Sequence, residues 1–137
     1  MKKAITVATL IKAPIEKVWT YWTEPQHITQ WNFASADWCA PSATNDLTKG
    51  GKFSFRMEAK DGSFGFDLEG VYDQVEIQKR IGYTLSDGRK VMVEFVIDGN
   101  TCKVVEEFEA ETENSEELQR AGWQAILDNF KKYVEEN

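Results

Sequence analysis

The sequence predicts an α+β fold in which an antiparallel, curved sheet of six to seven strands wraps around one long C-terminal helix, with two short helices after the first strand. Three observations lead to this prediction. Turns built on Asp-Gly at residues 61–62, 87–88 and 98–99 separate segments in which apolar and polar residues alternate, as in a β-meander. Residues 118–134 instead repeat apolar side chains at helical spacing. At 137 residues, the chain is expected to form a single domain over residues 1–137.

The N-terminal part is predicted to form a strand and then two short helices. Residues 5–11 alternate with a period near two and are rich in β-branched side chains. Pro14 suits the first position of a helix, because its missing N–H would be unpaired there. Pro25 ends this helix or offsets it into a second one over residues 26–30, which ends at Trp31. The first helix carries one apolar stripe, assigned to the core, made of Ile15, Val18, Trp19 and Trp22.

The middle of the chain carries most of the predicted strands. Between residues 32 and 49 the pattern is irregular: Trp38 and Cys39 fit a short strand, and residues 41–45 are predicted to form a loop. Strands are predicted over residues 53–59, from residue 64 to 72, and over 81–85, 91–97 and 102–110. Gly70 indicates a bend or bulge within its strand.

The C-terminal helix is predicted from a capping signal and a wide apolar stripe. Asn114 and Glu117 match a capping box, and acidic residues at 116 and 117 suit the positive end of the helix dipole. The apolar stripe between Leu118 and Val134 is wide enough for a helix that crosses a concave sheet.

Charge and composition exclude several classes of function. A net charge of −7 argues against a nucleic-acid partner and against an anionic membrane surface. The sequence has no apolar run near the length of about 18 residues that a membrane span needs, and the N-terminus develops no apolar signal region. We therefore expect a cytoplasmic protein, with Cys39 and Cys102 as two separate reduced thiols.

The sequence motifs predict no cofactor and no metal ion. The phosphate-binding glycine motifs, the zinc-protease motif and the serine-hydrolase motif are missing from the sequence. His27 is the only histidine, which excludes a site with several histidine ligands. We expect His27 on the solvated surface of the second short helix rather than in the role of a catalytic base.

A set of motifs, in this order and spacing, resembles one protein family. They are Ala13-Pro14-Ile15-Glu16-Lys17-Val18-Trp19, Trp31, Gly50-Gly51-Lys52-Phe53, Gly70-Val71-Tyr72, Ile81-Gly82-Tyr83, Asp87-Gly88-Arg89 and Gly122-Trp123-Gln124-Ala125-Ile126-Leu127. Over essentially the whole chain, the sequence resembles the activator of Hsp-90 ATPase homologue (Aha-type) family, within the superfamily of START-like and Bet v-like (SRPBCC) domains. The order of elements is that of the helix-grip fold.

The resemblance implies a cavity between the sheet and the C-terminal helix. Superfamily relatives bind lipids, sterols, polyketides or plant phenolics, and some catalyse cyclisation or hydrolysis. The eukaryotic founding protein of the family is a co-chaperone with an additional N-terminal domain that has no counterpart in these 137 residues. We therefore expect no chaperone activation, and fold alone does not define the function.

Glu106 is the candidate polar residue of this cavity and a weak candidate for catalysis. By alternation with Val104 and Phe108 it faces the concave side, where a carboxylate has to be paired, hydrated or protonated. A raised pKa would let it orient a ligand or act as a general acid or base. The alternative is a one-residue bulge that turns Glu106 outward beside Glu107, and the pattern does not decide between the two. Asp67, by contrast, is expected to be exposed.

Aromatic residues are the other candidates for ligand binding. Three of them lie in or beside the irregular segment, near the predicted mouth of the cavity, where loops tend to carry binding residues: Trp31, Phe33 and Trp38. Phe66, Tyr83 and Phe95 are expected on the sheet side and Trp123 on the helix side, with the Tyr83 hydroxyl able to hold a polar end of a ligand. For each of these the alternative is an aromatic side chain that simply fills the core.

Three functions fit these expectations. The first is a binding module for a small apolar or aromatic molecule, such as a lipid or polyketide. The second is an enzyme of the cyclase or hydrolase type that acts through Glu106 or a tyrosine. The third is an interaction protein that works through its surface, as the chaperone activators do.

Overall fold

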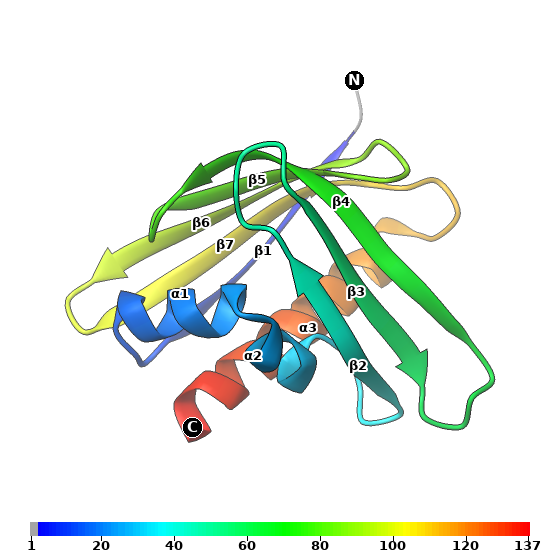
Figure 1. Cartoon of the computed structure of the whole chain (residues 1–137), viewed down its shortest axis with the longest axis horizontal. Coiled ribbons are helices and arrows are strands. Elements are labelled where there is room, and N and C mark those ends of the chain that lie inside the picture. Colours follow the sequence, from blue (N-terminus) through cyan, green and yellow to red (C-terminus); the bar gives the residue numbers. More distant parts are fainter. Residues whose placement is uncertain (1–2) are drawn as a thin grey trace.

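The computed structural model describes residues 3–137, and these residues form one seven-stranded antiparallel sheet and three helices (Figure 1). The strand order is β1-β7-β6-β5-β4-β3-β2, so β2 to β7 form a continuous meander and β1 pairs with the last strand. The predicted fold class is confirmed. The strands are β1 Ala4–Ile11, β2 Trp38–Asn45, β3 Lys52–Ala59, β4 Gly65–Glu76, β5 Arg80–Leu85, β6 Lys90–Asp98 and β7 Thr101–Glu109. The helices are α1 Ile15–Thr23, α2 Pro25–Trp31 and α3 Glu116–Glu136.

The sheet bends over α3, and the two short helices lie on the same concave side (Figure 1). The long helix α3 packs against β1, while α2 packs against β2 near the other edge of the sheet. Cys102 belongs to the core between these layers and Cys39 is half-buried, and both are free thiols. The core consists of large side chains that are less than 2% exposed, among them Ile5, Ile11, Val18, Val93, Val104, Phe108, Leu127, Phe130 and Val134.

The three Asp-Gly turns form the hairpins that the sequence predicts. Gly62, Gly88 and Gly99 have φ angles of 77°, 94° and 62°, in the left-handed region that glycine adopts without steric cost. They connect β3 to β4, β5 to β6 and β6 to β7. The meander therefore follows from local turn chemistry.

Two prolines define where the short helices begin. Pro14 lies one position earlier than predicted, as the N-cap of α1, and its carbonyl accepts hydrogen bonds from the N–H groups of Lys17 and Val18. Pro25 is the first residue of α2, where it leaves no helical hydrogen bond unmade.

Residues 41–45 form a strand, so the predicted loop is wrong. They pair with β3 as the second half of β2, after a register shift between Cys39 and Ser42 that contains Pro41. β2 is an edge strand, and a proline at a bulge in an edge strand costs no ladder hydrogen bond. The irregular sequence pattern reflects this bulge.

The cap of α3 also differs from the prediction. Ser115 is the N-cap, and its Oγ accepts a hydrogen bond of 3.1 Å from the backbone N–H of Leu118. The carbonyl of Asn114 instead accepts a hydrogen bond from the buried side chain of Gln119, which also bonds the backbone of Glu111. A serine serves as an N-cap as well as an asparagine, so the one-residue offset has little energetic consequence.

At Gly70 the backbone of β4 lies close to the Phe53 ring and to the backbone of Thr84, and the predicted bulge is not at this position. A Cβ atom at this position would lie 2.6 Å from the Phe53 ring and 2.8 Å from the Thr84 carbonyl oxygen. The register shift in β4 lies further along, between Tyr72 and Gln74. Glycine is needed here because the Phe53 ring crosses directly over the strand.

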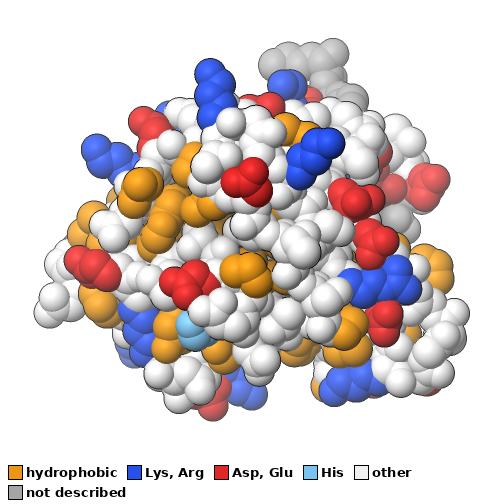
Figure 2. Space-filling view, viewed as in Figure 1, with side chains coloured by type: hydrophobic (Ala, Val, Ile, Leu, Met, Phe, Trp, Pro, Cys, Tyr) orange, Lys and Arg blue, Asp and Glu red, His pale blue; other side chains and the backbone are white. Residues whose placement is uncertain are grey.

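The face of the molecule shown in Figure 2 carries acidic and basic side chains intermingled with smaller groups of hydrophobic side chains. Such mixing is typical of a surface that keeps a protein dispersed in water. None of the helices within residues 3–137 is long and apolar enough to cross a membrane.

We predict opposite effects for alanine at two glycines. Gly70→Ala should lower the free energy of unfolding by about 1–3 kcal/mol, because the new methyl group collides with Phe53 and the sheet backbone. Gly122→Ala should raise it by up to about 1 kcal/mol, because this helical position has nothing within 4 Å of the added Cβ. Urea denaturation of both variants measures the difference, and equal effects would contradict the close approach at Gly70.

Candidate ligand cavity

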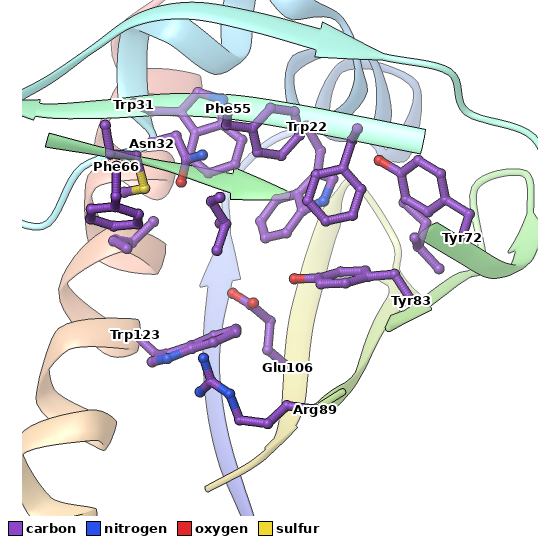
Figure 3. Close-up of a pocket in the computed structure, with 15 residues that line it drawn as sticks. Trp22, Trp31, Asn32, Phe55, Phe66, Tyr72, Tyr83, Arg89, Glu106 and Trp123 are labelled. Carbon is purple, nitrogen blue, oxygen red and sulfur yellow. The ribbon is translucent and has the colours of Figure 1, made fainter. Parts of the chain in front are cut away.

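A cavity of about 250 Å³ lies between the concave face of the sheet and α3 (Figure 3). Its wall is contributed by all three helices, by β3, β4, β5 and β7, and by the turn after β5. Most of the lining is apolar or aromatic. The lining residues are Trp22, Trp31, Asn32, Phe53, Phe55, Met57, Phe66, Leu68, Tyr72, Ile81, Tyr83, Arg89, Glu106, Trp123 and Ile126.

The alternating pattern of β3 and β4 explains the sheet side of this lining. In the antiparallel register Met57 lies opposite Phe66, and Phe55 lies opposite Leu68. Residues directly opposite each other in paired strands share a face, so all four side chains point into the cavity. The cavity lies between these side chains and α3.

Glu106 points into the cavity, which decides between the two alternatives left by the sequence. β7 pairs with β1 and β6 without a register shift, and Glu106 lies between Val7 and Val93. The predicted alternative of an outward bulge is wrong. The residue is only 4% exposed, and burial raises the pKa of its carboxyl group to about 8. At neutral pH the side chain is therefore a neutral acid that can donate a hydrogen bond.

Tyr83 and Asn32 add two further polar groups to the same space. Within residues 3–137, neither side chain makes a hydrogen bond, and the same holds for Glu106. Burial raises the pKa of Tyr83 well above its ordinary value, and the nearby charge of Glu106 adds to the effect. In Figure 3 the Tyr83 hydroxyl and the Glu106 carboxyl group are directed toward the same central space.

Tyr72 has a structural role instead. Its hydroxyl donates a hydrogen bond to the side-chain oxygen of Asn45, and the Asn45 amide group donates to the carbonyl of Thr23 at 2.7 Å. This chain of bonds connects β4 and β2 to the end of α1. Burial raises the pKa of Tyr72, so its hydroxyl stays protonated.

Arg89 brings a positive charge to the wall of the cavity. Its Nε donates a hydrogen bond of 2.8 Å to the Asp87 carboxylate in the turn after β5. The side chain is 18% exposed and extends toward Trp123 in Figure 3.

Five of the eight predicted ligand-binding residues lie in the cavity wall: Trp31, Phe66, Tyr83, Glu106 and Trp123. Their part in binding stays a prediction. The Trp31 indole N–H donates to the carbonyl of Tyr21 at 2.9 Å, and the Trp123 ring stacks on Phe108 at 3.9 Å between centroids. Both indoles are thus held in fixed orientations at the cavity wall.

Three predicted residues are placed outside the lining. The ring of Phe95 packs edge-on against Trp19 and Trp22 behind the wall, so the filled-core alternative holds for it. Trp38 instead packs edge-on against Phe64 and Phe66. Phe33 is half-buried, and its carbonyl lies 3.5 Å from the Asn129 amide nitrogen. Neither Phe33 nor Trp38 belongs to the cavity lining.

Two further expectations concern His27 and Asp67. His27 on α2 is half-buried rather than fully solvated: its Nδ1 lies 2.8 Å from the Tyr133 hydroxyl, and its ring stacks on Tyr21 at 4.0 Å. The end of α3 covers α2 and so removes His27 from full solvent contact. Asp67 is exposed, as predicted, and lies 3.5 Å from Arg56.

Several residues of the cavity lining are not among the predicted ligand-binding residues. Trp22 was assigned to the core, although it lies at the end of the α1 stripe and reaches the cavity. The alternation of β3 was a usable signal for Phe53, Phe55 and Met57, because it placed them on the concave face. Asn32 follows a helix end without a recognisable pattern. No group of three or more His, Cys, Asp or Glu side chains within the described residues is placed to hold a metal ion.

Comparison with known proteins places the chain in a family. The sequence profile described as "Activator of Hsp90 ATPase homolog 1-like protein" matches residues 12–135. A solution structure of an AHSA1-like protein from Aeromonas hydrophila is 44% identical, with a TM-score of 0.92 over 98% of this chain and 93% of that chain. A solution structure from Cytophaga hutchinsonii is 53% identical, with a TM-score of 0.84 over 97% and 92%.

More distant structures share the fold alone. A crystal structure of a protein from Chromobacterium violaceum is 18% identical, with a TM-score of 0.86 over 97% of this chain and 98% of that chain. No curated protein matches the chain significantly.

We predict that Glu106 makes stability fall as pH rises. Its pKa is higher in the folded protein, about 8, than the ordinary value of 4.5, so the folded state binds the extra proton between these values. Wild-type protein should lose a few kcal/mol of unfolding free energy between pH 5 and pH 9, with the loss levelling off above pH 8. Glu106→Gln should remove this slope in urea denaturation measured across the range.

The matched control is Glu107→Gln, which removes the neighbouring exposed carboxylate. It should keep the wild-type slope. Parallel pH profiles for wild type and Glu106→Gln would mean that Glu106 is hydrated and ionised in the folded protein.

Proposed function

Since the chain belongs to the family of Activator of Hsp90 ATPase homolog 1-like proteins, we propose that it binds a small, largely apolar molecule in the cavity between its sheet and α3. One observation carries the proposal. The apolar cavity of about 250 Å³ contains three polar side chains without a hydrogen-bond partner among the described residues: the buried Asn32 and Glu106 and the half-buried Tyr83. Apolar pockets with a few convergent polar groups are typical of small-molecule sites.

Physical considerations support an occupant rather than an empty core. Among the described residues no fully buried side-chain N or O atom lacks a hydrogen-bond partner, so the unpartnered groups of Asn32, Tyr83 and Glu106 face the open space of the cavity. A ligand with one polar end would form hydrogen bonds with them. Its apolar part would gain about 25 cal/mol for each Å² removed from water, before the costs of association.

The size of the cavity limits the occupant. Pockets for drug-sized ligands usually measure about 300–1,000 Å³, so a cavity of about 250 Å³ fits a compound of one or two rings. Phe66 lies at the boundary between cavity and solvent, because it lines the cavity and is 39% exposed. We place the entrance beside this residue.

A variant that fills the cavity tests the proposal. Ile126→Phe adds volume at the helix wall and should weaken binding of naphthalene-sized compounds at least about tenfold, since the space is already small. Binding is measured by calorimetry and by fluorescence of the indoles in the wall, which belong to Trp22, Trp31 and Trp123.

Leu118→Phe is the matched control, because it makes the same kind of change on α3 at a residue that is 60% exposed and outside the cavity. It should bind like wild type. Equal binding by both variants would place the ligand elsewhere, and no response of the wild type to a broad panel of apolar compounds would refute the proposal.

The pKa of Glu106 favours a second candidate function, acid–base catalysis of the cyclase or hydrolase type in the same cavity. A general acid works best when its pKa lies near the working pH, and a value of about 8 meets this condition. We expect Glu106→Gln to abolish turnover in a panel of aromatic esters and enolisable ketones while compounds still bind. An unchanged rate would exclude Glu106 as the catalytic group.

A further inference from the structure

We propose that the cavity selects its ligand by an oxygen that only accepts hydrogen bonds, such as the carbonyl of an aromatic ketone or a phenolate, and that Glu106 and Tyr83 are the paired donors. This inference rests on the proposed binding function and names the chemical class of the ligand. The observation behind it is that these two side chains, from different strands, both lack a partner in the described chain and converge on one space (Figure 3).

The sheet register brings the two donors together. Glu106 on β7 lies opposite Val93 on β6, and Val93 lies opposite Ile81 on β5. Tyr83 follows Ile81 by two residues and therefore shares its face. The two residues are two strands apart and offset by two residues along the strand, so their backbones are about 12 Å apart, and their long side chains bridge part of this gap. A ligand oxygen between them would meet both O–H groups.

The charges around the site favour an acceptor. Among the described residues, the titratable or charged side chains that share the cavity with Glu106 are Tyr83 from β5, Tyr72 from β4 and Arg89 from the turn after β5. The helix side contributes Trp123 and Ile126, which carry no charge. Arg89, which is also ion-paired with Asp87 at 2.8 Å, is the cationic group of this wall, while Glu106 is neutral at pH 7. Partial or full negative charge on a ligand oxygen is stabilised in such surroundings.

Two other ligand classes, amines and purely apolar compounds, fit the site less well. An amine would require an ionised Glu106 in a site whose burial disfavours the charge, and Arg89 would repel it. A purely apolar ligand would leave Glu106 and Tyr83 without partners, so it would forgo hydrogen bonds that an acceptor gains. The Tyr72 hydroxyl does not compete for the ligand, because it already donates to Asn45.

Three compounds of nearly equal shape test the inference: 2-acetylnaphthalene, 2-isopropylnaphthalene and 1-(2-naphthyl)ethylamine. Their dissociation constants are measured by calorimetry at pH 6 and pH 9.5. At pH 6 the ketone should bind at least about tenfold more tightly than either of the others, the gain expected for two hydrogen bonds. At pH 9.5 the preference should shrink, because Glu106 has lost its proton and then repels the ketone oxygen.

Substitutions test the contributions of the two donors, Tyr83 and Glu106, one at a time. Tyr83→Phe and Glu106→Leu should each reduce the preference for the ketone several-fold at pH 6 while binding of the isopropyl compound changes little. Glu106→Gln keeps a donor without a titratable proton, so its preference for the ketone should no longer depend on pH. Near-ultraviolet circular dichroism of each variant checks that the aromatic core is intact.

The outcomes distinguish this inference from the proposed function. Equal affinity for the ketone and the isopropyl compound, or tightest binding of the amine, would overturn the inference and leave ligand binding standing. Failure of all three compounds to bind, together with the rest of an apolar panel, would overturn the proposed function itself.

Discussion

The unbroken pairing of β7 with β1 on one side and β6 on the other is the constraint on which the site depends. Because neither ladder contains a register shift, every second residue of β7 faces the concave side, and Glu106 has no outward alternative. The same alternation places Val104 and Phe108 in the core on either side of it. The pairing of the strands therefore holds this carboxyl group in its buried position.

Strand alternation and turn chemistry made the fold predictable from the sequence. The glycines at 62, 88 and 99 need positive φ angles, and this requirement is visible in the residue type alone. The second half of β2 was not predictable in the same way. Its pairing depends on a bulge at Pro41 and on the exposed edge of β3, and neither leaves an alternating pattern in the sequence.

The candidate site was predictable only in part, for a different physical reason. Alternation indicates which side chains face inward, as it did for Phe66, Tyr83 and Glu106, but it does not tell whether the space in front of them is filled. That depends on how far the sheet curves from α3. Phe95 and Trp22 show the difficulty: the two rings touch, yet Trp22 borders the cavity and Phe95 lies behind it.

The buried acid also changes what the formal charge of the chain means. The value of −7 counts Glu106 as ionised, whereas the folded protein at pH 7 holds that proton and is one unit less negative. Unfolding at neutral pH exposes the side chain, which then releases its proton to the buffer. The heat absorbed on melting therefore includes the protonation enthalpy of whichever buffer is used, and the contribution of Glu106 raises the isoelectric point of the folded chain relative to that of the unfolded one.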